Sequence, residues 1–228
     1  MRRTELGLWA MLASLTAGTV LSLGSLVSTG YKLKAEALPP SVPFAAMLSP
    51  LALALEVAAI ALIASDSKRA GGVHRRLALV SAAFFLAWAV LNFTVFLPLS
   101  FLGMSAGSLE LVRLGLAVKA SAALLQYAVP FLLVYGLIRR SGVKAVLWLA
   151  LVMTVIGGLG ITATPITSVE LRSVVVSGTK LYVPKYEVDY TSWPYPAFLV
   201  FSHAGGILYI LVYVAVITAL RKATENNA

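Results

Sequence analysis

The sequence predicts an all-α integral membrane protein, a six-transmembrane-helix bundle with an extracytoplasmic β-hairpin between helices five and six. Three observations lead to this prediction: the composition, six long apolar segments, and an asymmetric distribution of Lys and Arg. Of the 228 residues, 60% are hydrophobic and 12% are charged, and the mean hydropathy is +0.91. About half of the usual charged positions are therefore missing. A chain of this size cannot bury so much apolar surface in one aqueous core, which excludes a soluble domain.

Six segments each hold the roughly 20 predominantly apolar residues that a membrane span requires. They cover about 6–30, 43–64, 77–102, 112–138, 145–165 and 196–220. The breaks between them contain turn-forming or charged residues, and all but the last break are short. We therefore expect consecutive helices to be antiparallel neighbours in one polytopic membrane domain that covers residues 1–228.

The first apolar segment has a second interpretation. Arg2 and Arg3, the apolar stretch, and the sequence Ala35-Glu36-Ala37 together imitate a cleavable signal peptide. The apolar stretch is, however, about twice as long as the roughly 7–15 residues of a signal-peptide core. We therefore expect an uncleaved signal-anchor helix.

The basic residues predict the orientation in the membrane. Eleven Lys and Arg belong to the amino terminus, the second loop, the fourth loop and the tail, whereas five belong to the first and last loops. The eleven are Arg2, Arg3, Lys68, Arg69, Arg75, Arg76, Arg139, Arg140, Lys144, Arg221 and Lys222, and the five are Lys32, Lys34, Arg172, Lys180 and Lys185. Because Lys and Arg are enriched on the cytoplasmic side, we expect a multi-pass protein of the cell membrane with both termini cytoplasmic. An even number of spans agrees with this orientation.

The last loop, an insertion at about 166–195, differs from the others in composition. Val169 to Val176 and Lys180 to Tyr190 are rich in β-branched and aromatic residues and are separated by a Ser-Gly-Thr turn, which predicts a β-hairpin. Alternation along the second strand places three candidate partner-binding tyrosines on one face. They are Tyr182, Tyr186 and Tyr190. Since an isolated hairpin is only marginally stable, this face needs a cover, which is the first outer loop, the membrane interface or a partner subunit.

Glu56 is the acidic residue expected nearest the middle of the bilayer, because ten helical residues, or about 15 Å, separate it from Asp66. A carboxylic acid at that depth faces the bundle interior and indicates a proton or cation relay, or a hydrogen-bond partner for a headgroup. The alternative is a protonated Glu that bonds a neighbouring helix and has only a structural role.

Four further polar residues complete the candidate ligand or proton pathway. They are Asn92, Lys119, Gln126 and His203. Their depth places them in the outer halves of their helices, above Glu56, and predicts a pocket that opens outward with Lys119 at its rim. Alternatively, Lys119 only anchors its helix by snorkelling, and His203 is satisfied within a packed helix interface. We expect no cofactor other than a bound quinone or lipid.

Several kinds of chemistry are excluded or unexpected. Cys is absent, which excludes disulfides, thiolate metal sites and cysteine nucleophiles. The two histidines lie on opposite sides of the membrane, so we expect no metal site and no His-ligated haem. No Walker loop, HExxH motif or Rossmann fingerprint occurs, which favours a protein without catalytic activity of its own. The scarcity of Asn, Gln and Cys favours a thermophilic source.

The loop Gly103-Met-Ser105-Ala-Gly107 places a Ser among small residues on the outer side, with His203 on a later helix. This arrangement resembles the rhomboid intramembrane proteases, which use a helix-top Ser and a His on a later helix near small residues. The resemblance implies an intramembrane hydrolase. The Gly-x-Ser-Gly motif of that family is not reproduced, and no His and Asn pair occurs in an earlier span.

Three hypotheses for the function follow. We favour a non-catalytic integral membrane subunit or scaffold of a larger complex, of the electron-transfer or quinone-associated kind, because redox ligands are missing while an aromatic hairpin needs a partner. The leading alternative is a small-solute or ion transporter that uses Glu56, and the third is an intramembrane hydrolase. The expected partners are the lipid bilayer and other membrane or extracytoplasmic subunits, or further copies of this chain. No nucleic acid is expected, since the basic residues lie in short loops beside apolar segments.

Overall fold

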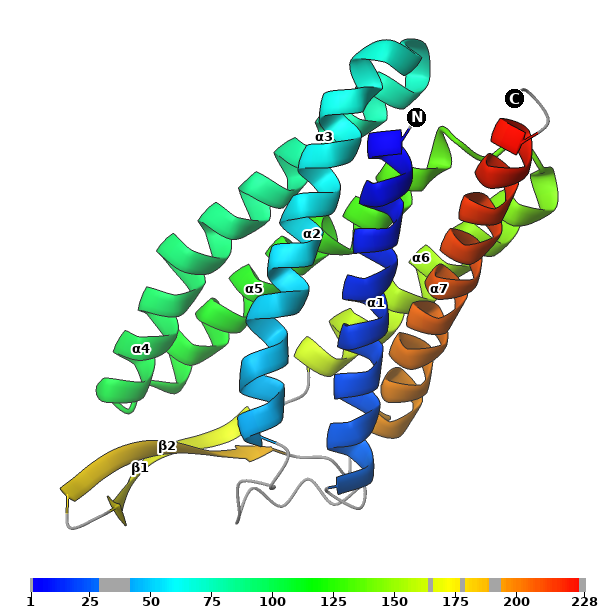
Figure 1. Ribbon diagram of the computed structural model, residues 1–228. Coiled ribbons are helices and arrows are strands. Elements are labelled where there is room, and N and C mark those ends of the chain that lie inside the picture. The colour runs from blue at the N-terminus through cyan, green and yellow to red at the C-terminus, as the bar shows by residue number, and fades with distance from the viewer. Residues whose placement is uncertain (1, 29–41, 164–165, 177–178, 189–193, 226–228) are drawn as a thin grey trace.

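The computed structural model describes residues 2–28, 42–163, 166–176, 179–188 and 194–225 (Figure 1). Most of this part of the chain is helical, and two strands precede the last helix. In chain order the elements are α1 (Arg2–Ser28), α2 (Val42–Ala70), α3 (Gly72–Val90), the π-helical turn η1 (Leu91–Phe96), α4 (Leu97–Ser105), α5 (Leu109–Tyr135), α6 (Ser141–Thr162), β1 (Ile166–Val176), β2 (Thr179–Val188) and α7 (Tyr195–Glu225).

Five helical stretches in the described part of the chain are long and apolar enough to cross a membrane. They are Pro50–Lys68, Gly72–Ser105, Leu109–Tyr135, Ser141–Thr162 and Ala197–Ala223. Each contains about 20 or more residues of high hydropathy, which is the length that the hydrocarbon core requires. The chain is therefore a helical multi-pass membrane protein.

The turn between α2 and α3 is shorter than the apolar segments predict. The segments end at 64 and resume at 77, but α2 continues to Ala70 and only Gly71 separates it from α3. Gly71 and Gly72 have φ angles of +64° and +55°, in the left-handed region that favours glycine. The two helices continue through charged residues past the apolar segments. A helix satisfies its own backbone hydrogen bonds whether its side chains are apolar or charged.

The third predicted span is one inclined helical rod. Gly72–Ser105 contains 34 residues, or about 51 Å of helix, which exceeds the roughly 30 Å hydrocarbon core and requires a tilt. Figure 1 shows α3 and α4 inclined to α1 and α2. The π-turn η1 precedes Pro98, which has no amide hydrogen, and the amide of Leu97 bonds the carbonyl of Asn92 five residues back.

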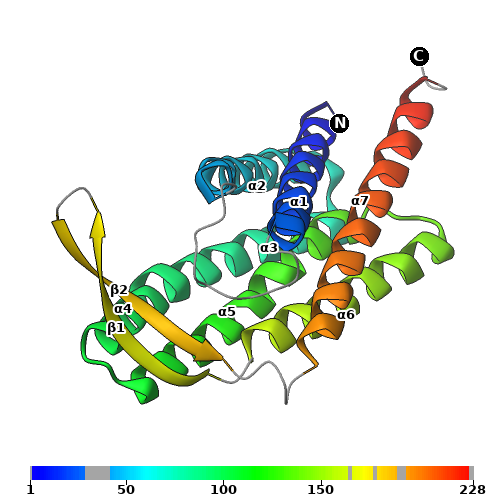
Figure 2. The ribbon, with the colours of Figure 1, turned by 90° about the horizontal axis from the view of Figure 1, so that it is seen from below.

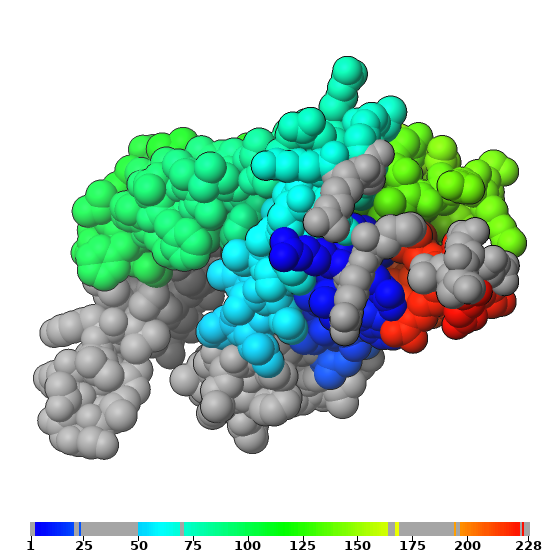
Figure 3. All heavy atoms as spheres, turned by 45° about the horizontal axis from the view of Figure 1, so that its top comes forward, coloured from blue at the N-terminus to red at the C-terminus, as the bar shows by residue number. Residues whose placement is uncertain are grey.

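The helices pack as three antiparallel pairs: α1 with α2, α3 with α5, and α6 with α7, while α1 also contacts α7. The amino end of α1, the carboxyl end of α7 and the α2–α3 turn lie at one end of the bundle, here called the termini end (Figure 1). The opposite end, which carries the strands, is called the hairpin end. In Figure 3 the termini end is turned forward, and α1 lies between α2 and α7.

The strands β1 and β2 pair antiparallel, with Ser173 opposite Tyr182 and Val169 opposite Tyr186. The register is irregular between Ile166 and Ser168. β1 contacts α4 and α5, and Figures 1 and 2 show the two strands extending past these helices at the hairpin end. Tyr190, the third predicted partner-binding tyrosine, lies outside the described residues.

The hydrophobic core is concentrated toward the termini end. Its large, fully buried side chains include Leu8, Ile63, Leu133, Leu147 and Tyr213, which come from five different helices. Each of these residues lies in the half of its helix nearer the termini end. This half of the bundle is therefore a close-packed core, and it supports the site that lies beside it.

Candidate functional site

A cavity of about 670 Å³ lies in the middle of the bundle. Six helices contribute to its lining, α1, α2, α6 and α7 through residues near the middle of their length and α3 and α5 through residues in their carboxyl-terminal halves. The lining residues are Met11, Ser14, Leu15, Gly18 and Thr19 of α1, Ala52, Leu53 and Glu56 of α2, Trp88 of α3, Gln126, Tyr127 and Pro130 of α5, Thr154 of α6, and Gly206 and Tyr209 of α7. This volume is typical of cavities that bind small molecules.

Glu56 and Gln126 meet in the lining of this cavity. The Gln126 Nε2 atom donates a hydrogen bond of 3.4 Å to Glu56 Oε2, although the two residues are 70 positions apart in the chain. Glu56 is 8% exposed. Among the lining residues there is no Lys, Arg or His, and no salt bridge to Glu56 is formed within the described residues. Glu56 is thus a buried acid whose partner is a neutral amide.

The segment of α5 that carries Gln126 is bound to α7 by two tyrosines. The Tyr209 hydroxyl donates to the carbonyl of Tyr127 at 3.2 Å, and the Tyr213 hydroxyl donates to the carbonyl of Pro130 at 2.8 Å. Residues four apart lie on the same face of a helix, so both hydroxyls of α7 reach α5 together. These bonds position α5 and, with it, the Gln126 amide.

Ser14 and Thr154 carry hydroxyl groups in the lining and were not among the residues that the sequence singled out. Ser14 Oγ donates to the carbonyl of Ala52 at 2.8 Å and so joins α1 to α2. Thr154 Oγ1 is buried and has no hydrogen-bond partner among the described residues. It lies against Gly205, where a Cβ would meet both the Thr154 hydroxyl and the backbone of α6. Small hydroxyl side chains are common within helices, and nothing in their spacing distinguishes these two.

Aromatic rings form another part of the lining, from Trp88, Tyr127 and Tyr209. The Trp88 ring is held by Phe85 and Phe93, whose centroids lie 5.2 Å and 6.3 Å from it. Trp88 follows the buried residues His74 and Ser81 of α3 at seven-residue intervals. That spacing, which keeps residues on one helix face, is a signal in the sequence that indicates an inward-facing indole.

Glycines shape the cavity where α1 and α7 approach it. No heavy atom lies within 4 Å of the position that a Cβ on Gly18 would occupy. A Cβ on Gly206 would lie 2.8 Å from the Thr19 Oγ1 atom. A larger side chain at Gly18 would therefore enter open space, whereas one at Gly206 would require the Thr19 side chain of α1 to move.

The other predicted pathway residues lie outside the lining. Lys119 is exposed, and its Nζ atom lies 5.2 Å from the centroid of the Phe96 ring. His203 Nδ1 lies 2.6 Å from the carbonyl oxygen of Leu199 on its own helix. Asn92 belongs to the π-turn η1 and is also absent from the lining. The structure thus brings Glu56 and Gln126 together, and it leaves Lys119, His203 and Asn92 nearer the hairpin end.

The Ser105 and His203 pair suggested by the rhomboid resemblance is not brought together. Ser105 Oγ donates to the carbonyl of Leu102 at 3.1 Å, one turn back in α4. In Figures 1 and 2, α4 and α7 lie on opposite sides of the bundle. A serine nucleophile requires its base within hydrogen-bond reach, so this pair does not support a hydrolase.

Within the described residues, no cluster of three or more His, Cys, Asp or Glu could hold a metal ion. The chemistry that the site offers is therefore that of one buried carboxyl group, one amide, hydroxyls and aromatic rings in a mostly apolar cavity. Comparison with protein-family models, curated proteins and solved structures found no match to this chain.

Proposed function

We propose that this chain is a membrane transporter for a small solute or ion and that Glu56 is the group that carries the transported charge. The observation that carries this proposal is the buried Glu56–Gln126 pair in the wall of a 670 Å³ cavity. Membrane carriers bind their substrates near the bilayer midplane, between helices. Acidic residues at that depth are rare and mark proton or ion pathways.

The partners of Glu56 favour an exchange reaction. A carboxylate that is buried without a positive partner is costly, so it takes up a proton or binds a cation. Gln126 donates one hydrogen bond to the carboxyl group and carries no charge of its own. Glu56 therefore alternates between a protonated form in the empty cavity and an ionised form that is neutralised by a cation.

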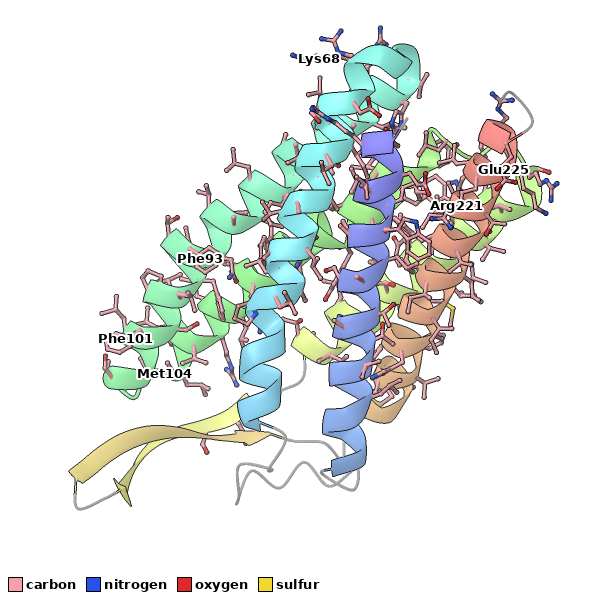
Figure 4. All side chains as sticks on the ribbon, in the orientation of Figure 1. Lys68, Phe93, Phe101, Met104, Arg221 and Glu225 are labelled. Carbon is pink, nitrogen blue, oxygen red and sulfur yellow. The ribbon has the colours of Figure 1, made fainter. Side chains whose placement is uncertain are left out.

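The proposed topology has six spans, with the termini end in the cytoplasm and the β-hairpin outside the cell membrane. The 27-residue helix α1 supplies the sixth span beside the five already described. The α2–α3 and α5–α6 turns and the helix ends beside them lie at the same end as both termini (Figure 1). They carry Lys68, Arg75, Arg76, Arg139, Arg140 and Lys144. Figure 4 shows Lys68 and Arg221 at that end. An excess of basic residues on one side is typical of the cytoplasmic face.

A flux assay on the full chain tests the transport function. The purified protein is reconstituted into liposomes that contain a pH-sensitive dye, and a panel of small cations, anions and neutral solutes is added in turn. We expect at least one solute to drive proton movement through the wild-type protein. Replacement Glu56→Gln removes the exchangeable proton and is expected to reduce this flux to that of empty liposomes.

The matched control is Glu110→Gln, the same chemical change at an exposed position in the first turn of α5, outside the cavity. We expect it to leave the flux unchanged. Flux in the Glu56→Gln variant equal to that of the wild-type protein, or no flux with any solute in the panel, would refute the transport function.

A second candidate function is that of a non-catalytic subunit in a larger membrane complex, in which the cavity holds a quinone or lipid. The observation in its favour is the β1–β2 pair, which extends past α4 and α5 beyond the helices (Figure 2). Native electrophoresis of the protein from its source in mild detergent tests it. A complex that loses mass when residues 166–188 are replaced by a short flexible linker supports this function. An active monomer contradicts it.

A further inference from the structure

We infer that the cavity binds a lipophilic organic cation, with its charge beside Glu56 and its apolar part against the aromatic side chains. This inference rests on the proposed transport function and names the class of solute. It starts from the charge content of the lining. α2 contributes Glu56, and α1, α3, α5, α6 and α7 contribute no charged side chain. An ionised Glu56 therefore has no positive partner among the described lining residues, and a bound cation would supply one.

The same lining disfavours anions and strongly polar solutes. An anion in the cavity would lie near a carboxyl group, and the described lining residues include no Lys, Arg or His to neutralise it. Three of the donors that line the cavity are already engaged: Gln126 donates to Glu56, Ser14 to Ala52 and Tyr209 to Tyr127. The Thr154 hydroxyl has no partner within the described residues and could meet one polar group of a ligand. A sugar or an amino acid would leave most of its own polar groups unpaired in a mostly apolar site, which is costly.

The aromatic side chains supply the other contacts that would bind the organic cation. Trp88 is backed by Phe85 and Phe93, so its indole needs no reordering to meet a ligand. The Tyr209 hydroxyl is bound to α5, which leaves the ring as the part that it contributes to the cavity. The faces of Trp and Tyr rings attract organic cations, most strongly where water is excluded. One carboxylate combined with aromatic rings is the donor set that such a cation requires.

Binding of a monovalent cation is balanced by loss of one proton. The protonated carboxyl of Glu56 releases its proton to solvent, and the resulting carboxylate pairs with the cation, so no net charge enters the cavity. Among the described lining residues, the other titratable groups are the phenols of Tyr127 and Tyr209, which keep their protons near neutral pH. The expected stoichiometry is therefore one proton released for each cation bound.

Equilibrium binding of a cation, an anion of the same geometry and a smaller neutral relative tests the inference. Radiolabelled tetraphenylphosphonium is the cationic probe, tetraphenylborate is the anion of the same geometry, and triphenylphosphine oxide is a neutral relative. All are measured on the purified full chain in detergent, together with proton release in weakly buffered solution. We expect saturable binding of the phosphonium, one proton released per ion, and no saturable binding of the borate or the oxide.

Variants connect the binding to the named residues. Glu56→Gln is expected to weaken phosphonium binding by about 30-fold or more and to abolish proton release, because the positive charge then lacks its partner. Glu56→Asp keeps the charge and should retain proton release. Trp88→Leu is expected to weaken binding by about threefold to thirtyfold, with proton release per bound ion unchanged. Glu110→Gln, which lies outside the cavity, is expected to bind as the wild-type protein does.

The outcomes separate this inference from the function on which it rests. Saturable binding of tetraphenylborate or the neutral oxide in place of the phosphonium would overturn the solute class, while Glu56-dependent flux of another solute would leave the transport function standing. The proposed solute class would also be overturned if phosphonium showed no saturable binding, or if Glu56→Gln did not weaken that binding. Loss of both binding and flux would refute the two together.

Discussion

The two halves of the bundle contrast in how similar side chains are packed. Toward the termini end, Leu8, Ile63, Leu133 and Leu147 are completely buried. In the middle, facing the hairpin end, the same helices surround a 670 Å³ cavity. Both regions are built mainly from apolar residues, so hydrophobicity alone does not explain the difference.

Specific contacts between helices account for the difference. At the termini end, Asp66 accepts hydrogen bonds from the amide and the hydroxyl of Thr4, at 3.2 Å and 2.7 Å, and Arg221 pairs with Glu5 at 2.6 Å. Toward the hairpin end, α3 and α4 incline away from α1 and α2 (Figure 1). In a membrane, burial of apolar surface supplies little net force between helices, so packing and polar contacts decide where they stay close.

The largest expected effect comes from the close approach of α6 and α7. A Cβ on Gly157 would meet the backbone of Ser202 and the carbonyl of Phe198. Gly157→Ala should therefore lower the free energy of unfolding by about 3 kcal/mol, measured by SDS titration in mixed micelles. Gly142, in the same helix, has no heavy atom within 4 Å of the position that a Cβ would occupy. Gly142→Ala should therefore leave the free energy of unfolding unchanged or raise it by up to about 1 kcal/mol. Equal effects would contradict the close contact.

A matched pair of leucines compares the packed half with the cavity directly. Leu133 is 0% exposed in the core, whereas Leu53 lines the cavity. Leu133→Ala should lower the free energy of unfolding by about 2 kcal/mol, because the surrounding side chains lose their contacts. Leu53→Ala should change it by less than about 0.5 kcal/mol, since one side of this residue already faces open space. If Leu53→Ala lowers the free energy of unfolding more than Leu133→Ala does in the same titration, Leu53 is the more closely packed residue. The contrast between the two halves is then wrong.

The hydrogen bond from Tyr213 of α7 to Pro130 of α5 provides a further test of the comparison between the two halves. Tyr213→Phe removes the donor to the buried carbonyl of Pro130 and should lower the free energy of unfolding by about 1 kcal/mol. Tyr135 on α5 is half-buried and stacks on Phe131 at 5.1 Å. Tyr135→Phe keeps that stacking and is expected to have almost no effect. Equal losses for the two variants would show that the Tyr213 bond does not stabilise the fold.

The smallest expected effect concerns the surface of the termini end. Glu5 pairs with Arg221, whose guanidinium also lies 5.3 Å from the centre of the Trp9 ring. Because both charged side chains are accessible, Glu5→Gln should lower the free energy of unfolding by about 0.5 kcal/mol or less. The difference should disappear in about 1 M salt, where the Debye length is only about 3 Å. A loss that persists at high salt would indicate a contribution beyond the ion pair.

The sequence predicts where the helices are better than where they begin and end. It also predicts how deep the site residues lie in the bundle better than which way their side chains face. Apolar length places the five described spans correctly, but it misses the extension of α2 to Ala70 and of α3 back to Gly72. His74, which falls between the predicted spans 43–64 and 77–102, lies buried in the first turn of α3 against Gly136. Charged residues near helix ends resemble loop residues in composition, so the pattern cannot locate the boundary.

The candidate site illustrates the same limit. Depth along the helices places Glu56 and Gln126 near one another, and the structure brings them into hydrogen-bond contact. Depth does not specify which way a side chain faces, so it cannot separate these two from Lys119 and His203. The hydroxyls of Ser14 and Thr154 have no unusual chemistry or spacing in the sequence. Their place in the cavity depends on how the helices are rotated, which only the tertiary structure supplies.

The position of Glu56 also makes this site sensitive to voltage. Glu56 lies at the centre of the 29-residue helix α2, so a charge that reaches it from either face of a membrane crosses about half of the electric field. Moving one elementary charge across 100 mV is worth about 2.3 kcal/mol, and half of that, about 1.1 kcal/mol, changes an equilibrium constant about sevenfold. The membrane potential therefore acts on the protonation of this carboxyl group as a shift of almost one pH unit would. At the same pH, the ratio of protonated to ionised Glu56 is therefore expected to differ about sevenfold between a membrane energised to 100 mV and a resting one.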